Sequence, residues 1–173
     1  MRKIFITAVM LLIPTFASAS DLISPTSEPQ LYCLAQNIYY EARSSSRADQ
    51  MAVSDVVLNR VKDRRYPNTI CEVVKQGPHR PSWKDNTVMI PVRHRCQFSW
   101  YCDGLSDRVH DLVTFDKIYT LTSGIVDGSF KVADITEGAT HYHADYVEPA
   151  WAKTKTKTIE IEDHIFYRWE VQE

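Results

Sequence analysis

A glutamate, Glu41, follows two tyrosines in the stretch IYYEAR, near the end of an apolar run. A carboxyl group can act as a general acid, but an ordinary glutamate has a pKa of about 4.3 and is ionised at neutral pH. Partial burial beside aromatic groups raises that pKa, because it disfavours the charged form. Tyr39 and Tyr40 offer such surroundings, whereas a close cation at Arg43 would oppose them. Glu41 is therefore a candidate proton donor, and a solvated glutamate at a helix end is the plainer alternative.

The stretch CQFSWYCDG carries two further polar candidates. Gln97 and Ser99 can hydrogen-bond hydroxyl or amide groups of a ligand, and a purely structural loop is the alternative. Trp83, Trp100 and Trp151 offer flat apolar faces for stacking, although a tryptophan is more often part of the packing.

The stretch THYHADY places two histidines two residues apart. On a strand, His141 and His143 share one face and can bind zinc together with Asp145, while Tyr142 points to the opposite face. An isolated H-x-H pair is a weak metal signal, so we expect no metal site.

The spacing of apolar residues predicts the helix that positions Glu41. Ser27 and Gln30 are typical of a helix start, and apolar side chains follow at i, i+3, i+4, i+7 and i+11: Leu31, Leu34, Ala35, Ile38 and Ala42. At 100° per residue, Glu41 falls about 80° from the centre of this stripe. The carboxyl is therefore expected at the rim of the core.

More helices are predicted up to residue 122, and strands after it. Ser46 and Asp49 can cap a second helix, and residues 69–76 form a short third one. Residues 77–95 read as a long irregular loop. A last helix is expected over 106–122, with Gly124 as its stop and these side chains facing inward: Val109, Leu112, Val113 and Tyr119.

After residue 139 the chain alternates between apolar and polar residues. THYHADYV and KTKTIEIEDHIFYRWEV are rich in threonine, isoleucine and aromatic residues, which predicts strands and a hairpin turning near Glu162 and Asp163. Helices followed by strands indicate an α+β domain: a helical core followed by a small C-terminal antiparallel β-sheet.

All four cysteines lie beyond the N-terminal apolar run, and an even number in an exported protein suggests two disulfides. Zinc is the competing use, but no C-x-x-C pair is present. Three pairings are possible, and we favour Cys33 with Cys71 and Cys96 with Cys102, because the second pair closes a short loop.

The N-terminus has the layout of a secretory signal peptide. Two basic residues precede an apolar run over 4–16 and then Ala17-Ser18-Ala19, so cleavage is expected after Ala19. A membrane anchor is the alternative, but the run is shorter than the ~20 residues of a bilayer span. We expect a periplasmic or extracellular protein with no stable membrane anchor and with this organisation: a signal peptide over 1–19, a short segment over 20–29 and a single catalytic domain over 30–173.

Composition limits the partners of the mature chain. Removing 19 of 173 residues leaves 154, enough for one domain with a substantial core. Losing Arg2 and Lys3 leaves 18 Lys and Arg against 22 Asp and Glu, a net charge of −4. A surface with this charge does not suit a polyanion, so nucleic acid is not an expected partner. We expect a monomer.

Five stretches occur in order between about Cys33 and Trp151: CLAQNIYYEAR, AVSDVVLNRV, YPNTICEVV, CQFSWYCDG and GATHYHADYVEPAW. Each alone is a weak signal, but together they resemble the SleB/CwlJ-type cell wall hydrolases, which act on peptidoglycan. The resemblance implies a lysozyme-like, lytic-transglycosylase-like core that needs no cofactor and binds peptidoglycan glycan strands. It also implies that Glu41 is the catalytic acid. Residues expected to bind the glycan are Tyr40, Gln97, Ser99, His141, Tyr142 and Trp151.

The sequence departs from the family pattern just after the glutamate. Ser44 and Ser45 stand where the family commonly reads Gly-Glu, and Asp49 stands where a glycine is usual. These departures put fine substrate preference in question more than the chemistry.

The type of reaction depends on whether a second carboxylate assists Glu41. Most glycosidases pair two carboxylates, and the candidates here are Asp55, Asp103, Asp134 and Glu137. None lies in a motif that marks it as catalytic, which favours a lytic transglycosylase in which the 6-hydroxyl of the sugar attacks. A muramidase-type hydrolase, a zinc amidase using His141 and His143, and a wall-binding module without activity are the alternatives.

Overall fold

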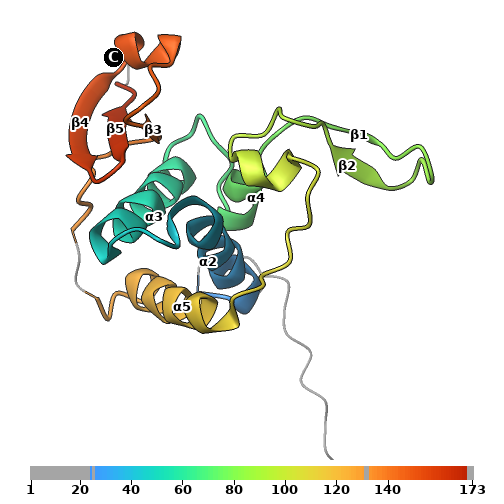
Figure 1. Ribbon diagram of the computed structural model, residues 1–173, viewed down its shortest axis with the longest axis horizontal. Helices are drawn as coiled ribbons and strands as arrows, with labels where there is room; N and C mark the ends of the chain where they lie inside the picture. The colour runs from blue at the N-terminus through green and yellow to red at the C-terminus, as the bar shows by residue number, and fades with distance from the viewer. Residues whose placement is uncertain (1–23, 25, 131–132, 171–173) are drawn as a thin grey trace, which may run out of the picture.

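The computed structural model describes residue 24 and residues 26–130 and 133–170. Helix α2 (Glu28–Ala42) lies at the centre of the helical part and packs against α3 (Arg47–Lys62), α4 (Ile70–Val74) and α5 (Leu112–Val126) (Figure 1). The whole predicted stripe of α2 is buried, and Leu34, Ala35 and Ile38 have no exposed surface. Burying a leucine or isoleucine side chain contributes about 1.5–3 kcal/mol. The stripe therefore holds α2 in one orientation, with Glu41 in its last turn.

Helix α3 begins as its sequence predicts. The Ser46 hydroxyl accepts a hydrogen bond from the backbone N–H of Asp49 at 3.3 Å. Val53, Val56 and Val57 are buried against the core. The backbone N–H of Ser46 also donates to the Glu162 carboxylate, at 3.0 and 3.1 Å. This contact joins the start of α3 to the turn between two strands of the C-terminal sheet.

Residues 77–95 contain a short hairpin, so the prediction of an irregular loop is wrong there. Strand β1 (His79–Pro81) pairs antiparallel with β2 (Met89–Pro91), and the hairpin projects from the helical body (Figure 1). Each strand has three residues and most of the side chains are exposed. Since neither face of the hairpin packs on a core, the sequence there has no alternating apolar pattern to reveal it.

Helix α5 begins six residues later than predicted. Asp111 caps it and accepts a hydrogen bond from the backbone N–H of Thr114 at 3.0 Å. The shift leaves Leu112 and Val113 exposed, with 69% and 68% of their surface accessible, so their predicted inward orientation is wrong. The carboxylate at the N-cap position fixes this start.

Gly124 lies inside α5 and does not stop the helix, contrary to expectation. An added Cβ there would lie 2.1 Å from the Phe130 ring, which folds back over the helix. Glycine is therefore needed at this position for close packing and not for a left-handed turn.

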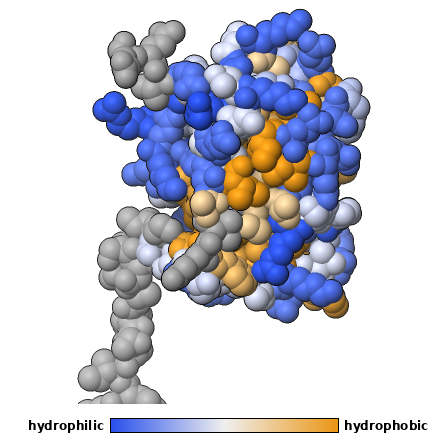
Figure 2. All heavy atoms as spheres, turned by 90° about the vertical axis from the view of Figure 1, so that its left-hand side faces the viewer, coloured by the Kyte–Doolittle hydropathy of each residue, from blue (hydrophilic) through white to orange (hydrophobic). Residues whose placement is uncertain are grey.

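The C-terminal strands form the predicted antiparallel sheet, with the order β3 (His141–Ala144), β5 (His164–Arg168) and β4 (Thr156–Ile161). The hairpin turns at Glu162 and Asp163 as expected, and the α+β prediction is confirmed. Phe166 is fully buried between the sheet and α3, against Ala52 and Val56. Ile135, Ile159 and Ile161 are half-buried and pack against the same cluster. Figure 2 shows that apolar side chains form a patch on this side of the molecule.

Two disulfides link the pairs favoured from the sequence. Cys33 of α2 is joined to Cys71 of α4, and Cys96 is joined to Cys102 at the end of the 3-10 helix η1 (Ser99–Cys102).

In the described part of the chain, none of the helices is long and apolar enough to span a membrane. The expected signal peptide lies outside the described residues.

Candidate active site

Glu41 lines a pocket of about 400 Å³ between the end of α2, the η1 region and the C-terminal sheet. The expected residues Tyr40, Gln97, Ser99 and Tyr142 line the same pocket. The remaining lining residues are Phe98, Trp100, His143, Ala144, Tyr146, Val147 and His164. The tertiary structure thus brings four of the six expected glycan-binding residues together with Glu41.

The hydroxyl of Tyr142 donates a hydrogen bond of 2.8 Å to Glu41 Oε2. Burial raises the pKa of Glu41, while the Tyr142 hydrogen bond and the charges of His164 and Arg60 oppose that rise without cancelling it. Burial beside Glu41 raises the pKa of Tyr142 well above 10, so its hydroxyl keeps its proton and remains a donor. Glu41 is therefore a carboxyl that holds its proton more tightly than an ordinary glutamate.

Arg43 does not play the opposing role expected from its position in sequence. Its guanidinium lies over the Tyr39 ring, 5.0 Å from the centroid, and its side chain is exposed. The cations that lower the pKa of Glu41 are His164 and Arg60, which come from distant parts of the chain.

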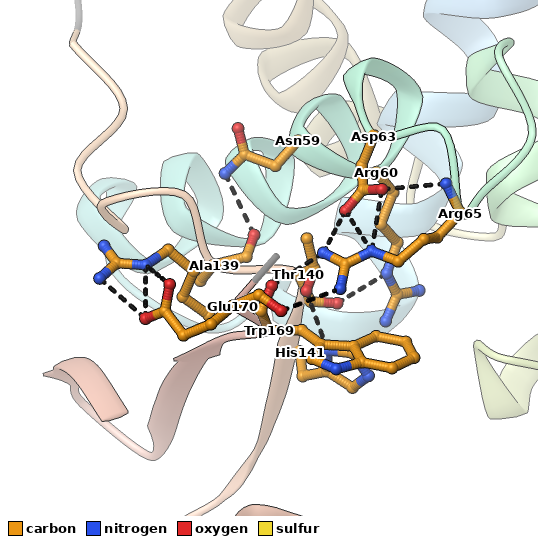
Figure 3. A network of polar contacts seen from close by, with 10 residues as sticks. Asn59, Arg60, Asp63, Arg65, Ala139, Thr140, His141, Trp169 and Glu170 are labelled. Carbon is orange, nitrogen blue, oxygen red and sulfur yellow. Dashed lines mark hydrogen bonds and ion pairs between the residues drawn. The ribbon is translucent and has the colours of Figure 1, made fainter. Parts of the chain in front are cut away.

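Two adjacent residues of α3 hold the start of β3 in place. Asn59 Nδ2 donates to the carbonyl of Ala139 at 3.1 Å, and Arg60 Nε donates to the carbonyl of Thr140 at 2.8 Å (Figure 3). Successive side chains of a strand point to opposite faces, so Thr140 and Tyr142 lie on the same face. Fixing the backbone at Thr140 therefore helps to aim Tyr142 at Glu41.

Arg60 is buried, with 4% of its surface exposed, and its guanidinium lies 5.3 Å from the Tyr66 ring centroid and 5.2 Å from that of Phe98. Such aromatic contacts stabilise a desolvated cation. No local pattern in the sequence marks Arg60 for this role.

One wall of the pocket is an aromatic stack. The rings of Tyr40 and Trp100 lie 4.7 Å apart at 15°, and Trp100 Nε1 donates to Asn37 Oδ1 at 3.0 Å. The Tyr40 hydroxyl also donates a hydrogen bond to the backbone carbonyl of Arg108, which holds the ring in place. The stack forms a rigid apolar surface next to Glu41.

His141 and Trp151 do not line the Glu41 pocket, so the structure does not bring these two expected glycan-binding residues to it. They lie on the other side of β3, with ring centroids 5.2 Å apart, and Figure 3 shows His141 beside Trp169. Burial, together with the charge of Arg60, lowers the pKa of His141 to about 3, so its ring is neutral. The alternation of the strand, which aims Tyr142 at Glu41, turns His141 away.

A larger hollow of about 690 Å³ lies beyond the end of α3, and its charged groups are largely paired with one another. Arg65 is hydrogen-bonded to Asp63, and Arg168 to Glu170 (Figure 3). The chemistry of the site therefore points to the smaller pocket around Glu41.

The candidates for a second acid lie outside that pocket. Asp55 accepts a hydrogen bond from the backbone N–H of Ile135, and Asp103 accepts one from that of Leu105. Asp134 accepts hydrogen bonds from Asn59 and Thr136, and the backbone carbonyl of Glu137 accepts one from Arg168. Among the described residues that line the pocket, Glu41 has the only carboxyl group.

A carboxylate that was not among the expected site residues lies behind the pocket wall. Asp49 is fully buried, and both of its oxygens lie 2.9 Å from Nδ1 of His164. In the sequence, Asp49 is marked as part of a helix start and as a departure from the family pattern, and nothing points to His164.

Residues 44–167 match the family described as Cell Wall Hydrolase, a range that begins just after Glu41. The crystal structure of the catalytic domain of the Bacillus cereus SleB protein is similar, at 21% identity and a TM-score of 0.58 over 88% of this chain and 100% of that one.

A second similar structure is the catalytic domain of the germination-specific lytic transglycosylase SleB from Bacillus anthracis. It is 21% identical, with a TM-score of 0.45 over 90% of this chain and 100% of that one. No curated protein matches the sequence. The B. cereus likeness shows a shared fold, which agrees with the α+β architecture described above.

Proposed function

Because the chain belongs to the Cell Wall Hydrolase family, we propose that it is a lytic transglycosylase that cuts peptidoglycan between MurNAc and GlcNAc with Glu41 as its catalytic acid. The observation that carries the proposal concerns the Glu41 carboxyl. Its pKa is raised, Tyr142 donates a hydrogen bond to it, and it is the only carboxyl among the described residues that line its pocket.

The reaction begins with proton transfer from Glu41 to the glycosidic oxygen, which breaks the bond to the anomeric carbon and leaves an oxocarbenium-like sugar. Glu41 is then a carboxylate, and the Tyr142 hydroxyl already points at it. A hydrogen bond to an ionised acceptor is about twice as strong as one between neutral groups. Tyr142 therefore stabilises the state that forms as the proton leaves.

The nucleophile of the second step is the substrate's own 6-hydroxyl. Its oxygen bonds to the anomeric carbon, and its proton passes to the Glu41 carboxylate, which restores the acid for the next turnover. Tethering gives this hydroxyl an effective concentration far above that of free water, an advantage that can reach several kcal/mol. A second carboxylate, which would otherwise hold water or trap the sugar, is not needed.

The pocket walls suit a sugar chain. The stacked rings of Tyr40 and Trp100 offer an apolar face, and Gln97 and Ser99 offer polar groups beside it. We assign glycan binding to Tyr40, Gln97 and Ser99, and to Tyr142 we assign contact with the catalytic carboxyl.

Replacing Glu41 tests the catalytic role. Glu41→Gln keeps the shape of the side chain and removes the acidic proton, so turbidity loss on purified sacculi should fall by orders of magnitude with little change in melting temperature. Glu28→Gln, at the exposed start of the same helix, is the matched control and should lyse normally. Near-normal lysis by the Glu41 variant would refute the proposal.

Mass spectrometry of the digest tests the type of reaction. Transglycosylation adds no water, so the muropeptides should be about 18 Da lighter than those of a hydrolase and should resist borohydride. Hydrated, reducible products would identify a muramidase-type hydrolase instead.

A further inference from the structure

A buried carboxylate–imidazole pair borders the Glu41 pocket. Asp49 lies in the first turn of α3, His164 opens β5, and the two meet through Nδ1 of the ring. The side chain of Asp49 is 1% exposed and that of His164 is 13% exposed. His164 lines the Glu41 pocket, so the pair places the buried Asp49 carboxylate directly behind the pocket wall.

The ring of His164 is fixed on two sides. Its Nδ1 faces both oxygens of Asp49, and its edge meets the Tyr142 ring at 5.0 Å between centroids and 75° between planes. The hydroxyl of Tyr142 in turn bonds to Glu41. Asp49, His164, Tyr142 and Glu41 thus form one contiguous polar and aromatic cluster built from α3, β5, β3 and α2.

The charges around His164 favour its protonated form. Burial alone would lower its pKa, but the hydrogen bond and charge of Asp49, and the charges of Glu41 and Asp163, raise it overall. The neighbouring carboxylate of Glu162 is bonded to Ser46. On the other side, Glu41 also faces Arg60, whose guanidinium is the second cation acting on it.

We propose that the Asp49–His164 pair is a positioning element of the active site, in which Asp49 holds an imidazolium beside Glu41 to stabilise the carboxylate formed during proton donation. The inference rests on the proposed catalytic role of Glu41 and deepens it.

Removing the imidazole should change how Glu41 titrates. In His164→Gln the nearby positive charge is lost, so the pKa of Glu41 rises further and the alkaline limb of the pH profile of lysis moves up. The expected shift is about one pH unit, at the lower end of what a close opposite charge produces. The rate on the plateau should fall several-fold, because the carboxylate that forms is less stabilised.

Two variants on α3 separate this effect from a loss of structure. Asp49→Asn removes the charge that favours the protonated form of His164, so the alkaline limb should move in the same direction. Asp55→Asn removes another carboxyl from the same helix but lies outside the pocket, and the limb should stay where it is. A purely structural role of the pair would lower activity without moving the limb, and that result would overturn the inference.

A reciprocal measurement needs no change at the pair itself. If Glu41 and His164 are coupled, Glu41→Gln must lower the pKa of His164 by as much as the imidazolium lowers the pKa of Glu41. The ring proton signals of His164 report this pKa by NMR in the wild-type and variant proteins. An unchanged His164 titration would overturn the inference, whereas full lysis by the Glu41 variant would overturn the proposed function.

Discussion

The hydrogen bond from Tyr142 to Glu41 gives the sharpest test of how the site is tuned. Tyr142→Phe removes only the hydroxyl and keeps the ring between His164 and Phe166. The Tyr142 hydroxyl stabilises the ionised form of Glu41 more than the protonated form. Removing the hydroxyl therefore disfavours the ionised form. The pKa of Glu41 should therefore rise.

The size of the effect follows from the kind of bond. A hydrogen bond to a charged group contributes about 1.5–3 kcal/mol, and one pKa unit corresponds to about 1.4 kcal/mol. The bond would thus shift the pKa by roughly 1–2 units if only the carboxylate made it. Protonated Glu41 can also donate a hydrogen bond to the phenol oxygen, so both forms gain from Tyr142. The expected rise in the pKa of Glu41 is therefore about one unit.

The assay is turbidity loss on purified sacculi between pH 4 and pH 9. The alkaline limb of the profile should move up by about one pH unit, and the plateau rate should fall about tenfold, the equivalent of 1.4 kcal/mol in the barrier. The free energy of unfolding should fall by only about 1 kcal/mol.

Tyr39→Phe is the matched control. The Tyr39 hydroxyl accepts a hydrogen bond from the backbone N–H of Asp111 at 3.1 Å, so this variant loses a phenol bond on the same helix as Glu41 without touching the carboxyl. Its alkaline limb should coincide with that of the wild type. If the Tyr142 variant shows an unshifted limb, the reasoning about Glu41 is wrong.

Two further predictions concern stability and export. Burial raises the pKa of Asp55 to about 7, above its unfolded value of ~3.8, so its contribution to stability is full below pH 4 and is lost as the pH rises to about 7. Asp55→Asn should therefore stabilise the protein at pH 8, by about 1–2 kcal/mol after allowing for partial solvent exposure, and a lower denaturation midpoint than wild type at that pH would contradict this. Protein recovered from outside the cytoplasm should begin at Ser20 and show no free thiols when native; retention of Met1 or four titratable thiols would count against export.

Local patterns in the sequence were enough to predict the elements that depend on neighbouring residues. The apolar stripe of α2, the Ser46 cap of α3 and the alternation of β3 each arise within a few residues, so their physics is visible in the printed sequence. The same patterns predicted Glu41 at the rim of the core, and Tyr142 on the face of its strand opposite to His141. They failed where a short segment packs on nothing, as in the 79–91 hairpin.

The partners of Glu41 were decided by the tertiary structure alone. Tyr142 lies 101 residues from Glu41 in sequence, and His164 lies 115 residues from Asp49. Contacts over such separations depend on how α3 and the C-terminal sheet pack, with Arg60 fixing the register at Thr140. A local period carries no information about that packing. The sequence therefore singled out Glu41 as the candidate proton donor, and the fold decided which groups surround its carboxyl and shift its pKa.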